Sequence, residues 1–140
     1  MANYYATIRT NYFSVKDETA FRELIQSVTA EDEVHIFEQP QSDGGKKFGF
    51  GCCGSIGGIA NPDDEDHPDL DVFLEALQKL VCEKDAIILT EVGSEKLRYV
   101  MGLSTVITHA KIQYVDIRSI ALEVAQKSLG NPDYTTQMDY

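Results

Sequence analysis

The sequence has few positive charges, few cysteines and no long apolar run. Its 12 Lys and Arg face 23 Asp and Glu, which leaves a net charge of −11 on 140 residues. Such a chain repels nucleic acid and anionic membranes and is attracted to cationic surfaces. We therefore expect neither nucleic acid nor a membrane as a partner, and we expect a basic protein instead.

The scarcity of apolar runs and of cysteines bears on the compartment. The longest apolar runs, such as residues 86–89, are far shorter than the roughly 20 residues that cross a bilayer, and residues 1–10 show neither a signal nor a transit peptide. Cys52, Cys53 and Cys82 fit neither a disulfide framework nor a zinc pattern. Small buried thiols in a reducing compartment are the simplest interpretation, so we expect a cytoplasmic protein.

The chain also lacks a recognisable catalytic constellation. His35, His67 and His109 show no spacing that points to a nucleophile–base pair with a cysteine. No serine lies in a nucleophile elbow. We therefore predict no catalytic residue, no metal site and no cofactor. An enzyme remains the less favoured class, because catalytic groups meet in space rather than in sequence.

Apolar periodicity predicts three helices. Residues 17–28, 69–81 and 117–129 each place apolar side chains at i, i+3 and i+4 along one face. Short β-branched or alternating runs between them predict strands joined by hairpins. The sequence therefore predicts one α+β domain over residues 1–140, in which about three helices pack on one face of a mainly antiparallel sheet.

Three finer features concern the path of the chain. Gly93 and Ser94 predict the tight turn of a hairpin between an apolar strand and a strand at Lys96–Gly102. The order helix, acid, strand, hairpin occurs twice, which is compatible with a weak α-β-β duplication. Residues 132–140 have no periodic pattern, so they form a tail that is either flexible or docked through its tyrosines.

A glycine-rich segment follows the first predicted hairpin. Gly49, Gly51 and Gly54 match the letters of G-x-G-x-x-G, but the residues that follow are too rich in glycine to begin the helix that a dinucleotide site requires. Gly49 and Gly51 alternate along a strand and leave a groove for a bulky side chain or for a partner's backbone. The alternative function is therefore a small enzyme or ligand-binding domain with its pocket at residues 49–58, lined by Gly49, Gly51, Cys52 and Gly54.

The densest charge lies in residues 61–71, NPDDEDHPDLD, which hold six acids and one histidine. The segment lacks the glycine and the terminal glutamate of an EF-hand, so a lone cation on Asp63, Glu65 or His67 is a minor alternative. A merely solvated loop is the plain interpretation. We favour a negative patch for a basic partner. Its predicted binding residues are Asp63, Asp64, Glu65, Asp66, Asp69 and Asp71.

Four segments carry a resemblance to known proteins: Tyr4–Phe13, Gly49–Gly58, Glu91–Tyr99 and Met138–Tyr140. In these the chain resembles small acidic bacterial proteins of plasmids, conjugative elements and phages, a group without a known activity. Acidic proteins of this size on mobile elements include anti-restriction and anti-CRISPR inhibitors, which occupy basic nucleic-acid channels. By that analogy we expect a non-enzymatic binding module that inhibits a basic, nucleic-acid-handling protein.

Overall fold

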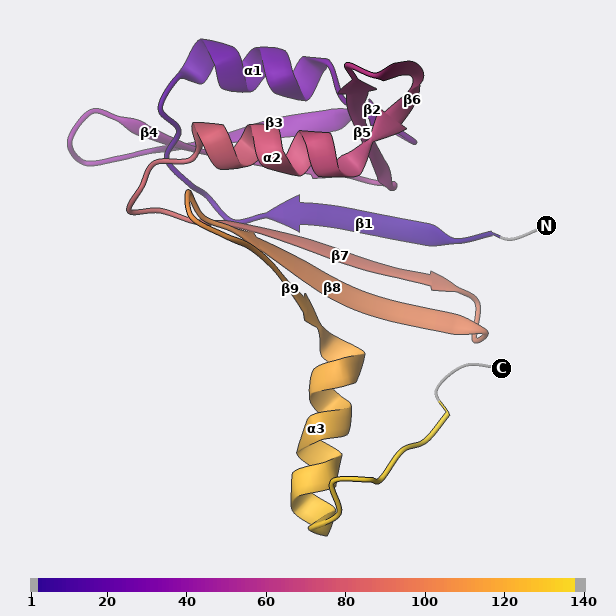
Figure 1. Ribbon diagram of the computed structural model, residues 1–140. Helices are drawn as coiled ribbons and strands as arrows, with labels where there is room; N and C mark the ends of the chain where they lie inside the picture. The colour runs from indigo at the N-terminus through magenta and orange to yellow at the C-terminus, as the bar shows by residue number, and fades with distance from the viewer. Residues whose placement is uncertain (1–2, 138–140) are drawn as a thin grey trace.

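The computed structural model describes residues 3–137, with the exception of the Glu65 side chain. Three helices and two antiparallel sheets make up this part of the chain (Figure 1). In chain order the elements are β1 (Tyr5–Thr10), α1 (Glu18–Gln26), β2 (Thr29–Ala30), β3 (Val34–Pro40), β4 (Lys46–Cys52), β5 (Ile56–Asn61), β6 (Asp64–Asp69), α2 (Leu70–Leu80), β7 (Ile87–Glu95), β8 (Tyr99–Ile107), β9 (Ile112–Asp116) and α3 (Ile117–Leu129).

The larger sheet has six strands in the order β3-β4-β1-β7-β8-β9, and every neighbouring pair is antiparallel. The smaller sheet has the order β2-β5-β6. The predicted α+β class with a mainly antiparallel sheet is therefore confirmed. The two predicted α-β-β units are α1–β3–β4 and α2–β7–β8. They flank β1 differently. Strand β1 pairs with β4, which is the second strand of the first unit's hairpin, and with β7, which is the first strand of the second unit's hairpin.

The core lies between the larger sheet and the two helices α1 and α2. Strand β1 alternates strictly, so that Ala6, Ile8 and Thr10 are buried under the helices while the residues between them are exposed. The interior is rich in phenylalanine rings that meet edge-on or tilted. The fully buried aromatic side chains are Phe13, Phe21, Phe50 and Phe73.

The third helix differs from the prediction that all helices pack on the sheet. Helix α3 has no buried residue, and Figure 1 shows it leading away from the sheet on the side opposite α1 and α2. Its ends agree with the predicted range 117–129: Asp116 caps its first turn, and Gly130 ends it in the left-handed conformation. Its apolar stripe is therefore present but is not covered by its own chain.

The predicted turn at Gly93 and Ser94 is wrong. Strand β7 continues through both residues, and the turn lies at Lys96–Arg98, where Lys96 has a φ of 50° and the Arg98 N–H donates to the Glu95 carbonyl at 3.1 Å. Gly93 is needed for a close approach rather than for a turn, because the Tyr4 ring lies where its side chain would be. Strand β8 accordingly begins at Tyr99 rather than at Lys96, and it continues beyond the predicted end at Gly102 to Ile107.

None of the helices in the described part of the chain combines the length and the apolar character needed to span a membrane.

Candidate functional site

The acidic segment predicted as a loop is largely a β-hairpin. Strand β6 carries Asp64 and Asp66 and pairs with β5, with Ile59 opposite Asp69 and Asn61 opposite Asp64. The side chains of Asp63, Asp64 and Asp66 are exposed, as is Asp71 in the first turn of α2. The side chain of Glu65 lies outside the described residues. The hairpin therefore holds several carboxylates on a paired backbone.

Asp69 has a structural role that the other predicted acids lack. Its Oδ1 accepts from the Val72 N–H at 3.3 Å and its Oδ2 accepts from Asn61 Nδ2 at 2.9 Å. The bond from Asn61 and then the backbone bond from Val72 lower the pKa of Asp69 below its ordinary value. Asp69 thus caps α2 and ties the hairpin to the helix, so it is a poor choice for a binding test.

A second acidic segment, which does not stand out in the sequence, borders the same small sheet at the start of β5. Glu31, Asp32 and Glu33 follow β2, and β2 pairs with β5 in the same small sheet. The Glu31 N–H donates to the carbonyl of Ser55 at 3.0 Å, which fixes the start of this segment. Figure 1 shows β2, β5 and β6 grouped at one end of α1 and α2. We call this the acidic end, formed by Glu31, Asp32, Glu33, Asp63, Asp64, Asp66 and Asp71.

The acidic end has few opposite charges. Neither residues 23–45 nor residues 48–78 contain a Lys or Arg. Within residues 3–137 its ion-pair partners are histidines: His67 Nδ1 lies 2.9 Å from Asp64 Oδ2, and His35 lies 4.0 Å from Glu33. Exposed pairs of this kind contribute at most about 1 kcal/mol. Its carboxylates therefore remain accessible to a cation from outside.

The hairpin does not assemble a metal site from the side chains whose positions are described. No group of three or more His, Cys, Asp or Glu among them is close enough to hold a metal ion. Of the predicted ligands Asp63, Glu65 and His67, His67 contacts Asp64, which was not among them, and the side chain of Glu65 lies outside the described residues.

The glycine-rich segment is an inner strand of the larger sheet. Gly49, Gly51 and Cys52 are buried in β4, and a Cβ on Gly51 would lie 2.8 Å from the Ile8 carbonyl oxygen. The Arg9 guanidinium lies 4.0 Å from the centre of the Phe37 ring, and both side chains reach the space over Gly51. The predicted groove is therefore occupied by the chain itself.

The two other residues of this segment lie outside the groove. Gly54 is buried beside Glu31 and Asp32, where a Cβ would lie 3.0 Å from the Glu31 Cβ. Cys53 is exposed, whereas Cys52 is buried and its thiol donates to the Asp32 carbonyl at 3.4 Å. Burial raises the pKa of Cys52, so this thiol is a poor nucleophile.

A small hollow lies instead between α2 and the sheet. It measures about 70 Å³ and includes Leu74, Leu103 and Glu91 in its lining. Glu91 accepts a hydrogen bond from the Tyr4 hydroxyl at 2.7 Å, and burial together with this bond raises the pKa of Tyr4. Ligand pockets usually measure about 300–1,000 Å³, so this hollow does not suit a metabolite.

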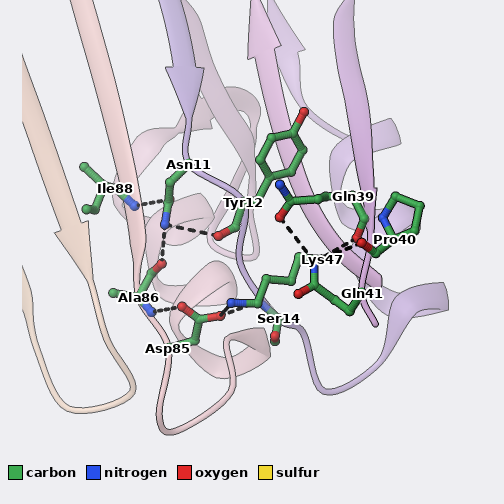
Figure 2. Close-up of polar contacts among 10 residues, drawn as sticks. All are labelled: Asn11, Tyr12, Ser14, Gln39, Pro40, Gln41, Lys47, Asp85, Ala86 and Ile88. Carbon is green, nitrogen blue, oxygen red and sulfur yellow. Dashed lines mark hydrogen bonds and ion pairs between the residues drawn. The ribbon is translucent and has the colours of Figure 1, made fainter. Parts of the chain in front are cut away.

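A polar cluster around Asp85 joins the end of β1 to the start of β7 (Figure 2). Asp85 accepts from the N–H groups of Ser14 and Ala86, each at 2.8 Å, and Lys47 Nζ lies 3.6 Å away. Asn11 donates to the Ala86 carbonyl at 2.9 Å and accepts from the Ile88 N–H at 2.7 Å. Because these side chains satisfy backbone groups, the cluster is structural rather than catalytic.

Replacing Asp85 by Asn is expected to lower the free energy of unfolding by about 1–3 kcal/mol at neutral pH, because the backbone donors lose a charged acceptor. Burial raises the pKa of Asp85, but the bonds from Ser14 and Ala86 and the charge of Lys47 outweigh it, and the net pKa is lowered. A lowered carboxyl pKa gives stability that is present above the ordinary value of 3.8 and is lost as pH falls through the folded value.

Urea unfolding between pH 7 and pH 2 measures this effect. The parent chain should lose more stability than Asp85→Asn on acidification, so that the two converge at low pH. The matched control is Glu83→Gln, a nearby exposed acid, which should keep the parent's pH profile. Parallel profiles for the parent and Asp85→Asn would show that Asp85 does not contribute in this way.

Comparison of the chain with protein-family models, with curated proteins and with solved structures finds no match.

Proposed function

We propose that the protein is a non-enzymatic binding module that presents its acidic end to a basic partner protein. The observation that supports this is that residues 31–33 and the β5–β6 hairpin both adjoin one small sheet, without a Lys or Arg in residues 48–78. The small sheet thereby carries two acidic segments that are distant in sequence, one beside the start of β5 and one in the hairpin at its end. A surface of a single sign accelerates the encounter with an oppositely charged partner.

The carboxylates of the acidic end lie on a supported backbone. Strand β6 is held by β5, and Asp69 anchors the hairpin to α2. A rigid arrangement of acids loses little conformational freedom on binding, which favours affinity. Such a surface suits a cytoplasmic partner whose basic groove otherwise holds nucleic acid, because the carboxylates can occupy the positions of phosphates. We propose inhibition of that partner, in keeping with the resemblance to proteins of mobile elements.

A charge-neutralised hairpin tests this function. One variant combines four substitutions: Asp63→Asn, Asp64→Asn, Glu65→Gln and Asp66→Asn. We expect it to fold, with stability changes within about ±0.5 kcal/mol per site, and to associate more slowly with the partner, because the steering charge is lost. The partner is first captured from the native host and identified, and its association rate is then measured at low and moderate salt.

The control carries the same change of charge elsewhere: Glu23→Gln, Glu75→Gln, Glu83→Gln and Asp133→Asn, all at exposed positions. It should associate at the parent's rate within a small factor. Equal rates for the hairpin variant and the parent would reject the acidic end as the binding surface. A melting temperature that millimolar calcium or magnesium raises in the parent but not in the hairpin variant would indicate a cation site instead.

A further inference from the structure

One side of the larger sheet is left uncovered by α1 and α2. On β1 this side carries Tyr5, Thr7 and Arg9. The strand pairing extends it to β7 and β8, because Thr7 pairs with Val92 and Ser94 pairs with Val100. We call it the open face. Nine of the thirteen exposed large apolar side chains lie on the open face or on α3. They are Tyr5, Ile88, Val92, Val100 and Val115 on the sheet, and Ile117, Ile120, Val124 and Leu129 on the helix.

The open face has almost no charge over β1, β7, β8 and β9. The acids of these strands lie on the opposite side of the sheet; they are Glu91, Glu95 and Asp116. Glu91 pairs with the buried Ile8, and the strand register places Glu95 and Asp116 on the same side as Glu91. Arg9 is the charged residue that these strands place on the open face. In a chain with a net charge of −11, an acid-free surface is the place where two copies can meet without strong repulsion.

Helix α3 needs a surface to pack on. It has 13 residues and no buried side chain, and isolated helices shorter than about 12–15 residues are marginal in water. Ile117 lies against Gly102 of β8, and the Arg118 guanidinium lies 5.4 Å from the centre of the Tyr99 ring. These contacts hold its first turn. Beyond them Ile120 and Val124 continue the apolar stripe into solvent, with 45% and 58% of their surface exposed.

We propose that a second copy of this chain covers the open face, with α3 of each copy packed across β1, β7 and β8 of the other around a two-fold axis. Each copy offers both an uncovered apolar helix and an uncovered apolar sheet, so a single symmetry operation covers both. A stable interface buries about 800 Å² per partner. Nine apolar side chains, each between 39% and 74% exposed, provide the core of such an area.

The chemistry of the surface favours a second copy over a basic protein. A cationic partner is attracted by carboxylates, which this part of the open face lacks. A hollow of about 470 Å³ between the sheet and the start of α3, lined by residues that include Tyr5, Val92, Val100 and Ile117, can take an apolar side chain from the facing copy. The dimer is independent of the acidic end, so the charge-neutralised hairpin variant should remain dimeric.

Sedimentation of the parent at micromolar concentration is expected to give a dimer. Val100→Asp on the sheet and Val124→Asp on α3 are each expected to weaken it by about 100-fold or more, because each places an acid in the apolar contact. Both sites are more than half exposed, so the melting temperature of the monomer should be retained. The control is Leu97→Asp, at a position 82% exposed in the β7–β8 turn, which should leave the dimer intact.

A crosslinking experiment tests the arrangement itself. Val100→Cys and Val124→Cys are placed in separate chains that both carry Cys53→Ser, and the mixture is treated with a short thiol crosslinker. We expect a bond between the two different chains. A monomeric parent, a dimer that survives both Asp substitutions, or crosslinks that join α3 only to α3 would each overturn the proposal. A monomer that loses a captured partner protein on Val100→Asp would assign the face to that partner and would also overturn it.

Discussion

Replacement of Phe73 by Ala is expected to lower the free energy of unfolding by about 3–5 kcal/mol. Phe73 is fully buried on the inner side of α2, and its ring meets that of Phe50 edge-on at 6.0 Å between centroids. Removing the ring leaves a cavity between α2 and the sheet that the neighbouring rigid rings cannot fill. Urea unfolding followed by far-UV circular dichroism measures the loss.

The control for this substitution lies on the same helix. Glu75 is exposed on α2, so Glu75→Ala should change stability by no more than about 0.5 kcal/mol. A loss below about 1 kcal/mol for Phe73→Ala would show that the helix does not pack through this stripe. The prediction was available from the sequence, because Phe73 lies on the single apolar face of the second helical pattern.

The helices were predicted better than their packing. Apolar periodicity places all three helices close to their observed bounds, and in the structure each is capped by an aspartate: Asp17, Asp69 and Asp116. An apolar stripe indicates that a helix needs a covering surface, but it does not say which chain provides it. The sequence therefore does not indicate that α3 contacts its own sheet mainly through its first turn, and the exposed remainder of the stripe supports the proposed second copy as its cover.

The candidate site was predicted in part, because its charges are local and its assembly is not. Residues 61–71 stand out by composition alone. The contribution of Glu31, Asp32 and Glu33 depends on the pairing of β2 with β5, between residues more than twenty positions apart, and a two-residue strand leaves little trace in a sequence.

The turn between β7 and β8 was misplaced because the glycine rule points to the wrong residue. Lys96 adopts a positive φ that sequence rules reserve for glycine, while Gly93 serves to admit Tyr4.

The glycines of residues 49–58 differ in how tightly the surrounding backbone restricts them. Gly49 and Gly51 allow β1 and β4 to lie close together, with their missing side chains at 3.0 and 2.8 Å from backbone oxygens. Gly58 on β5 is more restricted, because its φ is 120° and a Cβ would collide with the backbone of Asp69 and Leu70. The small sheet therefore lies against the start of α2 only if residue 58 has no side chain.

Gly58→Ala is accordingly expected to destabilise the protein by about 2–6 kcal/mol. Of this, about 1–3 kcal/mol comes from the positive φ, and a similar amount comes from the collision with backbone that cannot move aside. Since the collision separates β5 from α2, the cap at Asp69 should be lost as well. Thermal unfolding gives the total, and hydrogen exchange at the Val72 N–H, which donates to Asp69, reports the cap.

Gly44→Ala separates the two contributions. Gly44 also has a positive φ, of 90°, but a Cβ there would meet no atom within 4 Å. It should therefore cost only the conformational part, about 1–3 kcal/mol, and should leave exchange at Val72 unchanged. Equal losses for the two variants would mean that β5 and α2 are not in close contact. The acidic hairpin would then be supported by the pairing of β5 with β2 and with β6 alone.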